Sequence, residues 1–245
     1  MVLKASVNSF RKIFVWVVLS FFCSQIAYGV SVDTKSYDPF CGVGVKVAGK
    51  TLVIGWDTPE GSTELTLNLS GQGALVRSVA VASGKGKVIE VVRDINPVTV
   101  LTVGQRDLNK RSGWTIFFDR TSRKPSESGP LTLKLKSAIV RSVGKRCMVD
   151  LGELQGESFS GKLRFTIYAG CDLIHLQSVV QTNQDARALL YHAGLTCDPT
   201  GKTVSWIGLD DKVHQVSADM QPAEPEKVRH RTIALETEAG SLAVF

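Results

Sequence analysis

Apolar and polar residues alternate most regularly in the run from Leu163 to Leu195, which predicts three antiparallel strands joined by two tight turns. A first turn at Gly170-Cys171 places Phe165 opposite Leu176. Because side chains of a strand alternate between the two faces of a sheet, these pairings collect the apolar residues on one face. This face consists of Leu163, Phe165, Ile167, Ile174, Leu176, Val180, Leu189, Tyr191, Ala193 and Leu195.

The second turn is expected at Gln184-Asp185, which returns the chain beside the second strand and places Val180 opposite Leu189. A slip of one residue would scatter the apolar set over both faces, so the pattern supports this register. The polar residues of the run then share the other face. That face carries Arg164, Thr166, Tyr168, His175, Gln177, Gln181 and His192.

Short runs of β-branched residues recur every 8–12 residues or so from Val43 onward, a spacing typical of sandwiches and barrels. A break is expected at Asn96-Pro97, and the hairpins near the end of the chain turn at Asp210-Asp211 and Ala239-Gly240. No stretch after residue 29 has a capped helical period. The sequence therefore predicts an all-β fold, with a small β-module at 38–106 followed by an antiparallel β-sandwich at 107–245.

The first 29 residues have the layout of a secretory signal. Lys4, Arg11 and Lys12 precede a short apolar run, and Ala27-Tyr28-Gly29 supplies small residues for cleavage. The run is short for a bilayer-spanning helix, which needs about 20 apolar residues. We predict a cleaved signal peptide at 1–29, export to the periplasm or the cell exterior, and no stable membrane insertion afterwards. An uncleaved anchor is the alternative.

Removal of the signal changes the charge balance. The full chain has 29 Lys and Arg against 23 Asp and Glu, a net charge of +6. Residues 1–29 hold three basic and no acidic residues, which leaves 26 basic against 23 acidic residues, or +3. No basic cluster is interleaved with aromatic residues, so nucleic acid is not an expected partner.

Four cysteines remain after residue 29, namely Cys41, Cys147, Cys171 and Cys197. In an exported chain they allow two disulfides with three connectivities, and four free thiols are the alternative. The second turn would bring Cys197 to the same end of its strand as Cys171, so a Cys171–Cys197 bridge is predicted. No pair has the C-x-x-C spacing of a zinc or redox motif, and neither a metal nor a cofactor is expected.

The polar face of the predicted three-stranded sheet is the candidate site. With the pairing above, Gln177 lies between Arg164 and His192, and Thr166 lies opposite His175. Such side chains can donate and accept hydrogen bonds to hydroxyls and carboxylates, as a sugar requires. The predicted sugar-binding residues are Arg164, Tyr168, His175, Gln177 and His192, with His192 as the proton carrier in any chemistry. Replacing each by alanine is expected to cost about 0.5 kcal/mol or less. An ordinary solvated sheet face is the alternative.

The run Leu163–Leu195, which opens LRFTIYAG, resembles a strand pattern of galactose-mutarotase-like β-sandwiches in carbohydrate-active enzymes. The closest likeness is to the N-terminal domains of bacterial polysaccharide lyases of the rhamnogalacturonan-lyase type. The resemblance implies an exported protein with a large antiparallel sandwich and a following catalytic domain. It assigns no catalytic residue. The chain also stops at Phe245 within an expected strand, so we predict that it is the N-terminal part of a longer protein.

Two functions follow from these observations. The first is carbohydrate binding or polysaccharide processing, with a poly- or oligosaccharide as partner. The second is a non-catalytic surface, adhesion or scaffold module. A carboxylate near His175 or His192 in a cleft would favour the first function, and a flat solvated face would favour the second.

Overall fold

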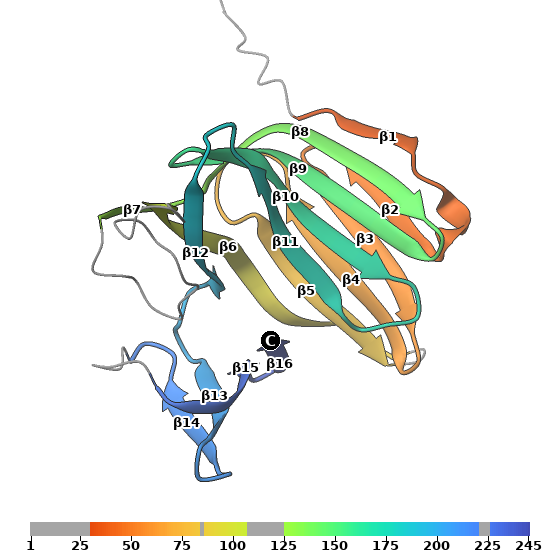
Figure 1. The fold of residues 1–245 in the computed structure, drawn as a ribbon. Coiled ribbons are helices and arrows are strands. Elements are labelled where there is room, and N and C mark those ends of the chain that lie inside the picture. The colour runs from red at the N-terminus through yellow and green to blue at the C-terminus, as the bar shows by residue number, and fades with distance from the viewer. Residues whose placement is uncertain (1–29, 84–85, 107–124, 221–225) are drawn as a thin grey trace, which may run out of the picture.

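The chain folds into β-sheets throughout the residues that the computed structural model describes, which are 30–83, 86–106, 125–220 and 226–245 (Figure 1). They form three sheets, mostly antiparallel, and a single 3₁₀ turn at Pro39–Cys41. The all-β prediction is confirmed. Within these ranges no helix is long and apolar enough to cross a bilayer. The expected signal peptide at 1–29 and residues 107–124 of the expected sandwich lie outside the described residues.

The first sheet has five strands in the order β1-β8-β9-β10-β11. The first of them runs parallel to β8, and the other neighbours are antiparallel. The strands are β1 (Val32–Ser36), β8 (Thr132–Val143), β9 (Arg146–Gly156), β10 (Phe159–Tyr168) and β11 (Ile174–Gln181).

The second sheet has seven strands, six of them in the order β12-β6-β5-β4-β3-β2, with β7 paired to β6. These strands are β2 (Val43–Ala48), β3 (Thr51–Thr58), β4 (Gly61–Asn68), β5 (Val76–Ser83), β6 (Ile89–Gln105), β7 (Ser126–Pro130) and β12 (Arg187–Thr196).

The hydrophobic core lies between these two sheets, which pack face to face (Figure 1). Alternation places an apolar side of most strands inward, and the buried residues include Leu52 and Leu67 of the second sheet and Phe165 and Ile167 of the first. The indole nitrogen of Trp56 also donates to a carbonyl of the other sheet's β10–β11 turn, at 2.8 Å. We predicted a boundary between residues 106 and 107; in the structure the strands on its two sides share one core.

The third sheet is smaller, with the order β14-β13-β15-β16. Its strands are β13 (Thr203–Gly208), β14 (Val213–Ser217), β15 (Val228–Thr237) and β16 (Gly240–Val244). Both predicted hairpins are present, the second with its turn at Glu238 and Ala239, one residue earlier than predicted. Leu235 and Leu242 pack against the main core, and the Thr237 hydroxyl donates to the Val91 carbonyl at 2.9 Å. These contacts attach the third sheet to the sandwich beside β6.

The first predicted turn is confirmed, because Phe165 lies opposite Leu176. The second predicted turn is wrong. After β11 the chain crosses to the other sheet, where β12 pairs with β6 and Leu189 lies opposite Val103. Val180 and Leu189 still pack against one small apolar cluster, which contains Leu101, Val103 and Phe159. Val180 and Leu189 therefore meet across the interface between the two sheets, whereas the prediction placed them opposite each other within one sheet.

The expected break at Asn96-Pro97 is also absent, since β6 runs through it for 17 residues. At this point β6 exchanges partners. Its pairing with β5 ends at Ile95 and its pairing with β12 begins at Asn96, whose side-chain oxygen accepts the Leu75 amide at 2.9 Å. Proline has no amide hydrogen to donate to a ladder, so a change of partner is a position where it is tolerated.

A glycine at the close approach of β10 and β11 should be required for their pairing. A Cβ atom on Gly161 would overlap the carbonyl oxygen of Val179, a backbone atom that cannot move alone. We expect Gly161→Ala to lower the free energy of unfolding by about 1–3 kcal/mol. Gly194→Ala is the matched control, because a Cβ there has no atom within 4 Å. Equal urea midpoints for the two variants would contradict this packing.

Candidate binding site

The outer face of the five-stranded sheet carries polar side chains on β8 to β11, with the apolar residues Ile139, Met148 and Val179 among them. The ladder register aligns them in rows: Arg164 lies between Asp150 and Gln177, and Thr166 lies between Met148 and His175. The residues before and after each of them point inward to the core. The strand alternation that buries Phe165 therefore places these polar side chains on the outer side of the sheet, although Asp150 and Thr166 are themselves buried there.

Four of the five predicted site residues lie on this face, namely Arg164, Tyr168, His175 and Gln177. The fifth, His192, does not. It lies on β12 opposite Val100 of the second sheet, so it cannot flank Gln177 as predicted. Of the four, His175 is exposed and the other three are partly buried.

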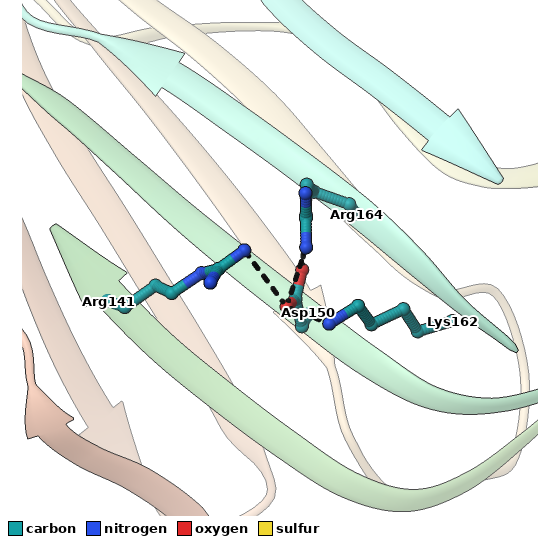
Figure 2. A network of polar contacts seen from close by, with 4 residues as sticks. All are labelled: Arg141, Asp150, Lys162 and Arg164. Atoms are coloured by element: carbon teal, nitrogen blue, oxygen red, sulfur yellow. Dashed lines mark hydrogen bonds and ion pairs between the residues drawn. The ribbon is translucent and has the colours of Figure 1, made fainter. Parts of the chain in front are cut away.

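A buried carboxylate stands at the centre of the face (Figure 2). Asp150 is only 4% exposed, although it points away from the core. Arg164 donates to both of its oxygens, at 2.6 and 3.1 Å, and the ammonium group of Lys162 lies 2.7 Å from Oδ2. Arg141 approaches the same oxygen from β8, at 3.6 Å. Three cations from two strands thus enclose one carboxylate.

These contacts keep Asp150 ionised. Burial by itself would raise its pKa, but the hydrogen bonds from Arg164 and Lys162 outweigh burial and hold the pKa below its usual value. The same hydrogen bond raises the pKa of Arg164. Asp150 is therefore poorly suited to carry protons near neutral pH. Arg164 has a structural partner, so the expectation that its replacement costs little stability does not fit its contacts.

The three cations are not used equally. The Nε atom of Arg141 is shielded from solvent and makes no hydrogen bond. A terminal nitrogen of the same guanidinium group lies 3.6 Å from Asp150, which is a loose contact. A guanidinium group has five N–H donors in a fixed plane. The Arg141 side chain is 37% exposed and its approach to Asp150 is loose, so its guanidinium group is less committed to Asp150 than that of Arg164.

Two hollows lie elsewhere on the molecule. One, of about 270 Å³, is bordered by residues of both sheets, including Leu131, Leu163 and Ser178. The other, of about 320 Å³, lies over β2 to β5 and includes Glu64. Neither is lined by any of the five predicted residues. The polar face of β8 to β11 is therefore separate from both hollows.

The third sheet holds a smaller polar group at its first hairpin. The ring of His214 stacks on Trp206 and its Nε2 lies 2.9 Å from Asp210 Oδ1, and Arg229 pairs with Asp211 at 2.7 Å. The imidazole lowers the pKa of Asp210 by its hydrogen bond. These groups are mostly exposed and satisfy one another around the turn. They also show no grouping typical of a metal site, and none occurs elsewhere in the described part of the chain.

All four described cysteines are free thiols. The argument for a Cys171–Cys197 bridge required β12 to pair with β11, and this pairing is not formed. Both residues are partly exposed, and their bridging in oxidised, exported protein stays a prediction. Cys41 and Cys147, in contrast, are buried in the core.

The Cys147 thiol should be unreactive in the folded protein. Burial, with a smaller contribution from nearby Cys41, raises its pKa to about 12. At pH 8 the thiolate that reacts with alkylating agents is therefore scarce. We expect iodoacetamide to modify Cys171 and Cys197 in folded protein kept under reducing conditions, and Cys147 only after unfolding. Peptide mass spectrometry would reveal this, and rapid native labelling of Cys147 would show that this end of the core opens.

The sequence analysis did not single out Asp150, Lys162 or Arg141. No family model matches the sequence, and a search of curated proteins found no match.

Proposed function

We propose that this chain is an exported, non-catalytic module that binds a polysaccharide along the outer face of β8 to β11. The observation that carries the proposal is the alignment of Arg164, His175 and Gln177, beside the buried Thr166, across neighbouring strands of the outer face. An extended polymer can lie along such rows and meet a similar group at each strand.

The residue chemistry supports a sugar ligand. Gln177 and His175 can donate to and accept from ring hydroxyls, and Tyr168 offers a partly exposed ring for stacking. The resemblance of Leu163–Leu195 to mutarotase-like sandwiches points in the same direction. The third strand of that run, β12, belongs to the other sheet. The resemblance is therefore used only for β10 and β11.

The absence of an acid–base arrangement on this face favours binding over catalysis. A glycan-cleaving site needs a proton carrier, whereas Arg164 and Lys162 hold the pKa of Asp150 below its usual value and keep it ionised. In the described residues the histidine–carboxylate contact is that of His214 with Asp210, on the third sheet. This arrangement suits a surface or adhesion module that binds its ligand without cleaving it.

The test is binding to immobilised neutral and acidic polysaccharides, such as galactan and polygalacturonate. We expect Gln177→Ala and His175→Ala to weaken binding by about tenfold, because each removes hydrogen bonds worth about 1.4 kcal/mol. His192→Ala is the matched control, since it removes an exposed histidine from the other sheet.

Thermal melting of each variant separates binding from folding. Equal affinity of all variants, or no binding of any polysaccharide by the parent, would overturn the proposal. The surface-module alternative, without a sugar ligand, would then take its place.

A further inference from the structure

We infer that the face contains an anion subsite at Arg141 and Lys162, and that the polysaccharide it selects is acidic, with carboxylate or sulfate groups. This inference rests on the proposed function and names its ligand class. It comes from the charges around Asp150, which the sequence analysis did not bring together (Figure 2).

The cluster around Asp150 carries an excess of positive charge. Arg141, Lys162 and Arg164 surround the single carboxylate of Asp150, so the group keeps two uncompensated positive charges. A structural ion pair requires only one cation per carboxylate. Lys162 and Arg141 lie 2.7 and 3.6 Å from the same oxygen of Asp150. Their positive charges repel each other, and a further anion bound beside them would reduce this repulsion.

The cluster also has unused hydrogen-bonding capacity. Arg164 is committed to Asp150 through two bonds and is the least exposed of the three cations, at 19%. Arg141 and Lys162 are each 37% exposed, and Arg141 Nε has no partner. A guanidinium group has five N–H donors, so Arg141, whose contact with Asp150 is the loose one at 3.6 Å, keeps donors for an acceptor on a bound ligand.

Arg141 comes from β8 and Lys162 from β10, and Asp150 lies on β9 between them. Their charged ends therefore converge above β9. Gln177 and His175 lie one strand further along on β11. A polymer that crosses the strands can thus place an acidic group on the cations and its hydroxyls on β11.

Planar carboxylates and tetrahedral sulfate groups both suit a guanidinium fork with an adjacent ammonium group. Polygalacturonate supplies the first, dextran sulfate the second, and galactan serves as the neutral comparison. Inorganic sulfate tests the subsite without any sugar.

The decisive variant is Arg141→Gln, which removes one charge and the guanidinium fork. Lys46→Gln is its matched control, because it removes one charge from an exposed position on β2 of the second sheet. We expect the parent to bind polygalacturonate about tenfold more tightly than galactan. Arg141→Gln should lose about tenfold in affinity for polygalacturonate and nothing for galactan, and Lys46→Gln should change neither by more than about twofold.

Equal losses in the two variants would overturn the subsite, because they would reflect diffuse attraction to a basic surface. Equal affinity of the parent for both polymers would overturn it as well. The sulfate arm separates this inference from the proposed function. If no polymer binds but sulfate raises the melting temperature of the parent and not of Arg141→Gln, the anion subsite stands and its assignment to polysaccharide fails. If galactan binds through Gln177 while neither sulfate nor polygalacturonate depends on Arg141, the proposed function stands and the inference fails.

Discussion

Replacing Asp150 by asparagine should lower the free energy of unfolding by about 3 kcal/mol. The side chain is 4% exposed and is the common partner of three cations, so its loss leaves Arg141, Lys162 and Arg164 facing one another without a counter-charge. The effect should lie at the lower end of the range for buried pairs, because the cations are partly exposed and can turn toward water. Urea unfolding at pH 7 measures it.

The dependence on pH identifies the cause. The folded-state pKa of Asp150 is below that of the same group in the unfolded chain. Its contribution is therefore fully present at neutral pH, declines below about pH 4 to 5, and is lost as the pH falls through the folded pKa. The difference in free energy of unfolding between the parent and Asp150→Asn should become smaller over the same pH range. Glu153→Gln, which removes an exposed ion pair with Lys136 from the same strand, should leave stability nearly unchanged. A constant difference down to pH 3 would show that charge is not the cause.

Phe165→Ala should destabilise the fold by about 3–5 kcal/mol. Phe165 is 2% exposed and lies between Val149 and Leu176 on the inner face of the first sheet, against the second sheet. Its removal takes away apolar burial and leaves a cavity that rigid neighbouring strands cannot fill. His175→Ala, on the outer face of the adjacent strand, should cost about 0.5 kcal/mol or less. Similar melting temperatures for the two variants would contradict the assignment of inner and outer faces.

The pattern of alternation predicted which face of β10 and β11 is buried, but it could not identify the sheet to which β12 belongs. Leu189 and Leu195 require an apolar environment, and both sheets of a sandwich supply one on their inner faces. The deciding contacts are with β6, which ends more than 80 residues earlier in the chain. Local periodicity contains no information about such a partner.

The pairing of Asp150 with Arg164 was not predicted for a different reason. Counted from the turn after β9, where Gly156 pairs with Phe159, Asp150 would fall opposite Phe165. A β-bulge between Gly161 and Lys162 shifts the register by one residue and brings Asp150 opposite Arg164. The aspartate within the apolar run CMVDLGEL was the available signal. Its partner could not be found without the bulge.

The return of β12 to β6 also affects the order in which the chain can fold. The Thr196 hydroxyl bonds the Asn96 carbonyl 100 residues away, and Trp56 bonds Cys171 across 115 residues. Closing loops of this length costs chain entropy before any contact compensates for it, and domains dominated by distant contacts fold in milliseconds to seconds. The β10–β11 hairpin can form early from neighbouring residues. β12 must wait until β6 is in place, so the seam between the two sheets closes late in folding.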